Sequence, residues 1–410
     1  MLLQAKPLLE TRGKGIILGA PDWGRLPAEL RHEVPVLSLA LPDRAALRDR
    51  LQATARSAQE SARRGNRPEP PALQEEEVAT LVDAAAGLTL SEASNAYALA
   101  FIKNLEKTTR AFDPETVRAE KMRLVKASGR LEVQEPIALD QVGGLDVLKD
   151  YLTSEVVRHA HDPLLKVRGI LAAGVPGTGK SLASKAAAAA LGWPLVRLDI
   201  SAQKGSLVGQ SEANMREALK LAEAISPCVL WIDELEKGVG GHASSANTDG
   251  GTSLGMLGHL LTWLQEHDKS ILTMATCNDA AKLPAELTRA GRFDERFFVD
   301  LPTTAERQAI AAIHLERLHV LHDEADDLPR QIAASTPAYT GAEIEQVIKS
   351  AARRREGEHV VADDIEAAVA RTKPLSETAR EALAKMREWG AQVTRANAPE
   401  LAVATERRMA

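Results

Sequence analysis

GVPGTGKS, residues 174–181, follows the apolar run GILAA at residues 169–173 and precedes an alanine-rich segment. The eight residues fit the phosphate-binding pattern Gly-x4-Gly-Lys-Ser/Thr without a gap. In such a loop the glycines let backbone N–H groups face phosphates, and the helix that follows adds the positive end of its dipole. We expect a strand, a loop and a helix in this order, since that context separates a nucleotide site from a glycine-rich turn.

Individual residues of this loop have distinct expected contacts. Lys180 would reach the β and γ phosphates, and the Ser181 hydroxyl would hold Mg²⁺. The other residues of the stretch that we expect to contact the nucleotide are Pro176, Gly177, Thr178, Gly179 and Leu182. The pattern therefore predicts ATP and Mg²⁺ as cofactors.

A second apolar run, CVLWI at residues 228–232, leads directly into Asp233 and Glu234. The run is typical of a buried parallel strand that brings carboxylates to the edge where open α/β sheets bind ligands. We expect Asp233 to bind Mg²⁺ through water, and Glu234 to polarise the attacking water. Alone, the stretch could be a core strand with an acidic end, but the phosphate loop upstream favours the catalytic interpretation.

A third apolar run, ILTMAT at residues 271–276, ends at Cys277 and Asn278. The Asn278 amide could hydrogen-bond the γ phosphate or the water, although asparagine is also an ordinary turn residue. Beyond it, Arg289 and Arg292 stand three positions apart. A guanidinium supplied by a neighbouring subunit can accelerate phosphoryl transfer by roughly 10³ to 10⁵. The same arginines could instead pair with acids on the surface.

Together these motifs resemble the classical subgroup of AAA+ ATPases over residues 136 to about 372. GVPGTGKS resembles its Walker A motif, VLWIDE its Walker B, ATCN its sensor 1, and LTRAGRFDE its second region of homology with paired arginine fingers. The resemblance implies a doubly wound parallel sheet with a helical lid. It implies ATP hydrolysis in a ring of about six subunits, with catalytic roles for Glu234, Asn278, Arg289 and Arg292.

The resemblance extends to segments on either side of the loop. DQVGG resembles the segment whose backbone contacts adenine, which implies nucleotide contacts for Val142 and Gly143. His314, in AAIH, stands where the family has a nucleotide-contacting histidine. YTGAE resembles the turn that replaces a sensor 2 arginine, which assigns Gly341 and Ala342 to the nucleotide. WIDELEKGVGG, HLLTWLQEHDKS and GRFDERFFVDLP further resemble plastid and bacterial ATPases named for a hypothetical chloroplast reading frame.

A candidate substrate segment is KGSLVG at residues 204–209, which resembles the first pore loop of classical AAA+ unfoldases. The resemblance implies substrate contacts for Gly205, Ser206, Leu207 and Val208. Leu207 stands where an aromatic residue is usual, and an aliphatic tip lacks the flat ring that packs against varied side chains. Processive threading therefore stays open, as does a plain strand-to-helix connection.

Length and composition fit two or three domains, since the chain has 410 residues and 44% apolar content. The net charge of −6 gives no overall attraction to nucleic acid or anionic membrane. Cys228 and Cys277 are expected to be buried reduced thiols. No apolar run approaches the roughly 20 residues of a membrane span, and no signal peptide is evident, so we expect a cytoplasmic protein without membrane insertion.

The N-terminal region has its own expected organisation. Short strands at residues 15–19 and 34–39 and a helix at 44–56 predict a smaller α/β domain, residues 1–128. Residues 20–25 lack the Gly-Lys-Ser/Thr of a phosphate loop, and residues 75–101 resemble an AAA+ lid. We interpret the domain as a degenerate ATPase, with an unrelated α/β adaptor as the alternative.

The remaining boundaries follow from breaker residues. We expect a large ATP-binding α/β subdomain at residues 129–302, a helical lid at 303–372 with Thr340 as a helix N-cap, and a C-terminal helix and tail at 373–410. Three smaller features are a mobile loop at 57–77, an interdomain linker at 125–136, and a frayed or partner-dependent segment over the last twenty or so residues.

Three functions from different classes remain open. The first is a ring-forming ATPase that remodels an unidentified partner protein. The second is an ATP-gated assembly switch or scaffold that threads nothing. The third is a nucleic-acid-associated ATPase, for which the only support is the triple-basic run RRR at residues 353–355. Because such runs are usually solvated helix faces, a nucleic-acid partner is the least favoured.

Overall fold

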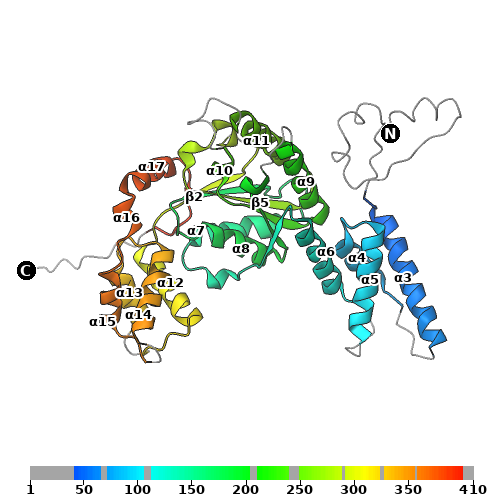
Figure 1. The fold of residues 1–410 in the computed structure, drawn as a ribbon, viewed down its shortest axis with the longest axis horizontal. Coiled ribbons are helices and arrows are strands. Elements are labelled where there is room, and N and C mark those ends of the chain that lie inside the picture. Colours follow the sequence, from blue (N-terminus) through cyan, green and yellow to red (C-terminus); the bar gives the residue numbers. More distant parts are fainter. Residues whose placement is uncertain are drawn as a thin grey trace, which may run out of the picture.

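The computed structural model describes residues 41–65, 72–105, 112–203, 210–239, 249–288, 291–323, 327–355 and 358–399. Figure 1 shows a central sheet covered by helices, with the helical lid on one side of it and a group of N-terminal helices on the other. The sheet is mixed but mainly parallel, which confirms the predicted α/β class.

The sheet of the described residues has the order β1-β3-β4-β5-β2-β6-β7. All neighbouring pairs are parallel except β1 and β3, which are antiparallel. The three predicted apolar runs form β2, β4 and β5, and every residue of these strands is buried. The strands are β1 (Glu132–Gln134), β2 (Gly169–Gly174), β3 (Leu195–Leu198), β4 (Cys228–Ile232), β5 (Ile271–Cys277), β6 (Glu295–Val299) and β7 (Thr394–Arg395).

Helices cover both faces of the sheet, as Figure 1 shows. On one face, α7 (Asp146–Tyr151), its continuation over Leu152–Val157, and α8 (Lys180–Leu191) enclose an apolar cluster that includes Phe297. On the opposite face the core includes Met215 and Leu260, and it also contains the thiols Cys228 and Cys277, which are buried and free as predicted. The helices there are α9 (Gln210–Ile225), α10 (Leu235–Val239), α11 (Asp249–Glu266) and α17 (Arg380–Gly390).

The lid is a separate helical unit with its own apolar core. Its first helix begins at a capping box formed by Thr303 and Glu306, and α14 begins at one formed by Thr340 and Glu343. The second box confirms the predicted N-cap at Thr340. The lid helices are α12 (Thr304–Arg317), α13 (Leu328–Ser335), α14 (Gly341–Arg354) and α15 (Ala362–Val369).

The described part of the N-terminal region consists of helices and the loops that connect them. Its helices pack around the fully buried Tyr97. The predicted strands at 15–19 and 34–39 lie outside the described residues, so the α/β character of this domain stays a prediction. The helices are α3 (Arg44–Arg64), α4 (Glu75–Ala85), α5 (Leu90–Leu105) and α6 (Pro114–Ser128).

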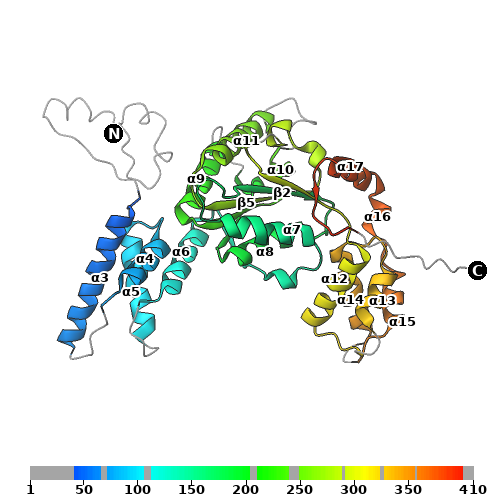
Figure 2. The same ribbon diagram turned by 180° about the vertical axis from the view of Figure 1, so that it is seen from behind.

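The N-terminal helices lie beside the helices that cover the sheet, with α6 next to α9 (Figure 2). Gly87, between α4 and α5, has a φ of +88°, and a Cβ there would lie 1.6 Å from the Ala224 carbonyl oxygen of α9. Only glycine fits both the backbone conformation and the space. Lys121 of α6 is buried nearby and donates to the Ala86 carbonyl at 3.1 Å.

Three expectations about connecting segments were wrong. Of the loop expected at 57–77, residues 57–64 form the solvated end of α3 and residues 75–77 begin α4, while residues 66–71 lie outside the described residues. The expected linker at 125–136 contains the end of α6, with Val125 buried, and all of β1. At the C-terminus, α16 (Leu375–Thr378) and α17 replace one continuous helix, and residues 391–399 of the segment expected to fray add β7 to the sheet. Residues 400–410 lie outside the described residues, so for them that expectation stays a prediction.

In the described part of the chain, helices with the length and hydropathy needed to cross a membrane are absent.

Candidate functional site

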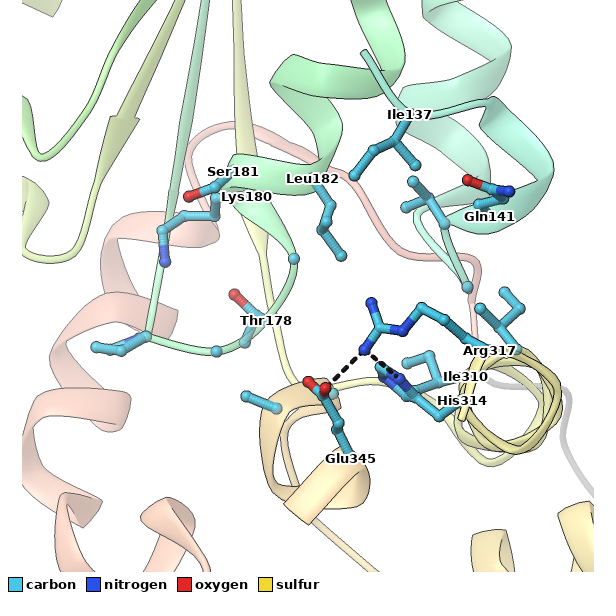
Figure 3. Close-up of a pocket in the computed structure, with 18 of the residues that line it drawn as sticks. Ile137, Gln141, Thr178, Lys180, Ser181, Leu182, Ile310, His314, Arg317 and Glu345 are labelled. Atoms are coloured by element: carbon cyan, nitrogen blue, oxygen red, sulfur yellow. Dashed lines mark hydrogen bonds and ion pairs between the residues drawn. The ribbon is translucent and has the colours of Figure 1, made fainter. Parts of the chain in front are cut away.

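A cleft of about 1120 Å³ opens at the carboxyl end of β2, between the sheet and the lid (Figure 3). In the sheet order, β3, β4 and β5 lie on one side of β2 and β6 on the other, so this is a topological switch point, where open α/β sheets bind ligands. The predicted nucleotide-contacting residues on its wall are Val142, Gly143, Pro176, Gly177, Thr178, Gly179, Lys180, Ser181, Leu182, Asp233, His314, Gly341 and Ala342.

The phosphate loop curls around its own lysine. The Nζ of Lys180 donates to the carbonyl oxygens of Gly174 and Val175, each at 2.7 Å. Gly177 and Gly179 have φ angles of +81° and +98°, a region that residues with a side chain rarely adopt. Burial lowers the pKa of Lys180 to about 8. The loop therefore offers a desolvated ammonium group and a turn of backbone N–H groups.

Two carboxylates stand at the carboxyl end of β4, held by polar groups from β5. The Thr276 hydroxyl donates to Oδ1 of Asp233 at 2.7 Å and accepts the backbone N–H of Glu234 at 3.1 Å. The side-chain amide of Asn278 donates to Oε1 of Glu234, also at 3.1 Å. Glu234 has a φ of +50°, a conformation that costs energy and is concentrated at functional sites.

The other carboxylate oxygen of Glu234 pairs with Lys237 at 2.5 Å, and the Lys237 side chain is 59% exposed. The carboxylate is thus held from the inside by an amide and from the solvent side by an exposed cation. Because an exposed ion pair contributes little, the Asn278 contact is the one that fixes the position of Glu234.

The lid closes the cleft from the opposite side. The backbone N–H of Ala342, in the predicted Gly-Ala turn, donates to the Gly177 carbonyl at 3.2 Å, so the lid touches the phosphate loop directly. Figure 3 shows Arg317 between His314 and Glu345 on this wall. Arg317 donates to Nδ1 of His314 at 3.0 Å and pairs with Glu345 at 2.6 Å. Burial lowers the pKa of His314, so its ring is more readily neutral than a free histidine.

Residues 142–145, which directly precede α7, pack against α12. A Cβ at Gly143 would lie 2.6 Å from the side chain of Ile310, so the backbone approaches this helix closely. The backbone N–H of Leu145 donates to Oε1 of Glu306 at 3.0 Å. Val142 and Ile310 both line the cleft and give this end an apolar wall suited to a base ring.

The structure brings the residues predicted for binding and for water activation into one cleft, with Glu234 and Asn278 beside Lys180. Arg292 does not line this cleft. Its backbone lies against Gly169, at the start of β2, and its guanidinium donates to the Glu286 carbonyl. Arg289 and the predicted substrate residues Gly205, Ser206, Leu207 and Val208 lie outside the described residues, so their roles stay predictions.

Sequence reasoning missed four polar residues of this site. Thr276 lies within ATCN but was given no role of its own, although a polar residue near the end of an apolar run was an available signal. Arg317 and Glu345 lie one helical turn from predicted positions, His314 and Gly341 respectively. Arg197, which pairs with Asp233 at 3.1 Å, gave no local signal because it reaches the site from a neighbouring strand.

Comparisons with known proteins agree with this geometry. Residues 170–301 match the family described as "ATPase family associated with various cellular activities (AAA)". The crystal structure of the FIGL-1 AAA domain in complex with ADP superposes with a TM-score of 0.55 at 21% identity, over 67% of this chain and 97% of that one. At this identity the likeness shows the fold alone.

Sequence relatives extend the match over most of the chain. The AAA domain-containing protein ycf46 of Guillardia theta is 31% identical over 388 residues, which is 93% of this chain and 73% of that protein. The ycf46 protein of Gracilaria tenuistipitata var. liui is 42% identical over 234 residues, 56% of this chain and 47% of that protein. Because the first alignment spans both the N-terminal helices and the ATP-binding cleft, this chain belongs to the ycf46 family of AAA domain-containing ATPases.

Proposed function

We propose that this chain hydrolyses ATP in a ring of about six identical subunits and uses that hydrolysis to remodel a partner protein. The hydrogen bond between Asn278 and Glu234 carries the proposal, because it positions a carboxylate in the same cleft as the phosphate loop. Phosphoryl transfer needs a positioned nucleophile and charge stabilisation more than covalent chemistry.

The residues of the cleft divide the work. Lys180 leaves the carbonyls of its own loop and meets the β and γ phosphates. Glu234 orients a water molecule and accepts its proton, while Asn278 keeps the carboxylate directed at that water. Ala342 and His314 close the lid side of the nucleotide. Excluding bulk water in this way strengthens each of these electrostatic contacts.

Mg²⁺ fits the donors that the cleft offers. Ser181 provides a hydroxyl oxygen and Asp233 a carboxylate, which are the hard ligands that this ion prefers. Clusters of three or more histidine, cysteine or acidic side chains able to hold a metal are absent from the described residues. The pair Ser181 and Asp233 suits an ion that takes its remaining ligands from phosphates and water. When bound, it would neutralise phosphate charge. Both Asp233 oxygens already accept protein hydrogen bonds, which favours contact through water.

The arginines support assembly into a ring. Arg292 lies at the amino end of β2, whereas the phosphate loop follows its carboxyl end, so this side chain is remote from the cleft of its own subunit. In a heterologous ring, each site combines one subunit's loop with the arginines of the next. We assign Arg292 to the neighbouring subunit's γ phosphate on this ground, and Arg289 with it because both belong to the stretch that resembles the paired arginine fingers.

Mixing inactive subunits tests the proposal. Lys180→Ala subunits cannot bind ATP but keep their arginines, and Arg289→Ala subunits keep their phosphate loops. ATPase activity should be absent from each variant and return when the two are combined, and mass photometry with ATP should show about six subunits. Full activity of Arg289→Ala alone, or hydrolysis by a strictly monomeric species, would contradict the in-trans mechanism.

The partner is proposed to be a protein, contacted through Leu207 and its neighbours. Affinity capture with Glu234→Gln, which should retain ATP, is expected to hold the partner, and Leu207→Ser in the same background should release it. Partner-stimulated hydrolysis that is unaffected by Leu207→Ser would favour the assembly-switch alternative. Salt-dependent DNA binding by the intact chain would favour the nucleic-acid alternative.

A further inference from the structure

Arg197, the third residue of β3, bridges two carboxylates: Glu132 in β1 and Asp233, which directly follows β4. Its Nη2 donates to Oδ2 of Asp233 at 3.1 Å, and its Nη1 donates to Oε2 of Glu132 at 3.0 Å. The guanidinium carbon lies 5.3 Å from the ring centroid of Trp231, which restrains the plane of the guanidinium. The Arg197 side chain is only 26% exposed, so its charge is incompletely screened by solvent.

Glu132 belongs to the segment that joins the N-terminal helices to the sheet. It lies in β1, directly opposite Arg197 in the antiparallel pairing with β3. The segment follows the C-terminal Gly129 cap of α6, and Arg130 fastens it to α9 through Asn214 at 2.7 Å and Glu217 at 2.5 Å. Any displacement of the N-terminal helices that moves β1 therefore changes how the Arg197 charge is shared.

We propose that Arg197 is a positioning residue that sets how much negative charge Asp233 presents to Mg²⁺, and that Glu132 adjusts this by drawing the guanidinium away. The inference rests on the proposed metal-binding role of Asp233. A cation paired with Asp233 competes with Mg²⁺ for the same carboxylate, and a second carboxylate on that cation weakens the competition. Through this pairing, β1, which joins the N-terminal helices to the sheet, is linked to the nucleotide site.

Substitutions of Arg197 and of Glu132 should therefore have opposite effects on Mg²⁺-dependent nucleotide binding. Removing Arg197 frees Asp233 and should strengthen Mg²⁺-dependent nucleotide binding. Removing the Glu132 charge leaves the full guanidinium charge on Asp233 and should weaken it. If Glu132 acts through Arg197, its removal should have no further effect once Arg197 is absent.

The test is the ratio of the Kd of a fluorescent ADP analogue in EDTA to its Kd in MgCl₂, measured by anisotropy on the full chain. Arg197→Met should raise this ratio about three- to tenfold and Glu132→Gln should lower it about threefold, as expected for one nearby charge at a partly screened site. The double variant should match Arg197→Met. Arg118→Met is the control, because it removes an exposed ion pair with Glu115 on α6 and touches neither β1 nor Asp233, and it should keep the wild-type ratio.

Two further results have definite meanings. A lowered ratio for Arg197→Met, or an unchanged ratio for both Arg197→Met and Glu132→Gln, would overturn the competition and leave Arg197 with a structural role only. A wild-type ratio of one would instead overturn the metal role of Asp233, and this inference with it.

Hydrogen exchange at β1 gives a readout that does not depend on the variants' affinity. Mg²⁺ with ADP should slow exchange there in the wild type, because a metal-bound Asp233 releases Arg197 to Glu132.

Discussion

The Nδ2 group of Asn397 donates a hydrogen bond to Oε2 of Glu306 at 3.0 Å, across 91 positions of sequence. Oδ1 of the same amide accepts the backbone N–H of Asp300 at 2.9 Å. Through its other oxygen, Glu306 accepts the N–H of Leu145 beside the nucleotide cleft. One buried amide therefore joins the C-terminal segment, the sheet and the first lid helix.

We expect Asn397→Ala to lower the free energy of unfolding by about 2 to 4 kcal/mol, because it removes two hydrogen bonds and leaves the buried backbone N–H of Asp300 without a partner. Urea unfolding followed by circular dichroism would measure the loss. Gln392→Ala, at an exposed position of the same segment, is the control and should change stability by less than about 0.5 kcal/mol. Equal unfolding midpoints for the two variants would contradict the role of the amide.

Two threonines of β5 form a matched pair for a test of the acidic site. Thr276→Val removes the hydroxyl that holds Asp233 and the backbone of Glu234, so ATPase activity should fall roughly 10²-fold. The Thr273 hydroxyl is buried and makes no hydrogen bond, so Thr273→Val should be neutral or stabilising. Steady-state hydrolysis and thermal unfolding of both variants decide the question. Comparable activity losses would show that strand packing, and not the hydroxyl contact, is at stake.

At Glu234, binding and chemistry should separate. Glu234→Gln is expected to keep nucleotide affinity while turnover falls by about 10² or more, the usual contribution of a positioned general base. Lys237→Met serves as the control, since it removes only an exposed ion pair and should alter turnover by no more than about twofold. Calorimetry and a phosphate-release assay measure the two quantities. Near-normal turnover by Glu234→Gln would remove this residue from the role of base.

The buried Lys121 should give stability a pH dependence. Burial lowers its pKa from 10.5 to about 8. Between these values the unfolded chain binds more protons than the folded chain, so this residue makes the free energy of unfolding rise with pH. The difference between wild type and Lys121→Met should therefore shift in favour of wild type from pH 8 to pH 10 in urea unfolding. Lys126→Met, at an exposed position of α6, should show no such trend.

The cleft was predictable because its signals are local. The phosphate loop is a contiguous pattern, and β2, β4 and β5 are mainly apolar runs, the last two of which lead into Asp233 and Glu234 and into Asn278. Parallel strands must bring such ends to one edge of a sheet. Residues spread over more than a hundred positions could thus be assigned to one site without coordinates.

The sheet edges were not predictable for the opposite reason. β1 consists of Glu132, Val133 and Gln134, and β7 of Thr394 and Arg395, which are too short and too polar to give a strand pattern. Their pairing is decided by the open edges of β3 and β6. Arg197 escaped notice in the same way, because its contact with Asp233 depends on which strands become neighbours.

The two edge strands also bear on self-association. β7 pairs with the outer edge of β6 at Phe297 and Phe298. The backbone N–H of Ala396 adds one more hydrogen bond, to the Phe298 carbonyl at 2.9 Å. An uncovered edge with two phenylalanines would offer free N–H and C=O groups to another chain. A chain ending at residue 390 should consequently aggregate during refolding, because it lacks β7 and Ala396, which cover the edge of β6 and protect it against intermolecular strand pairing.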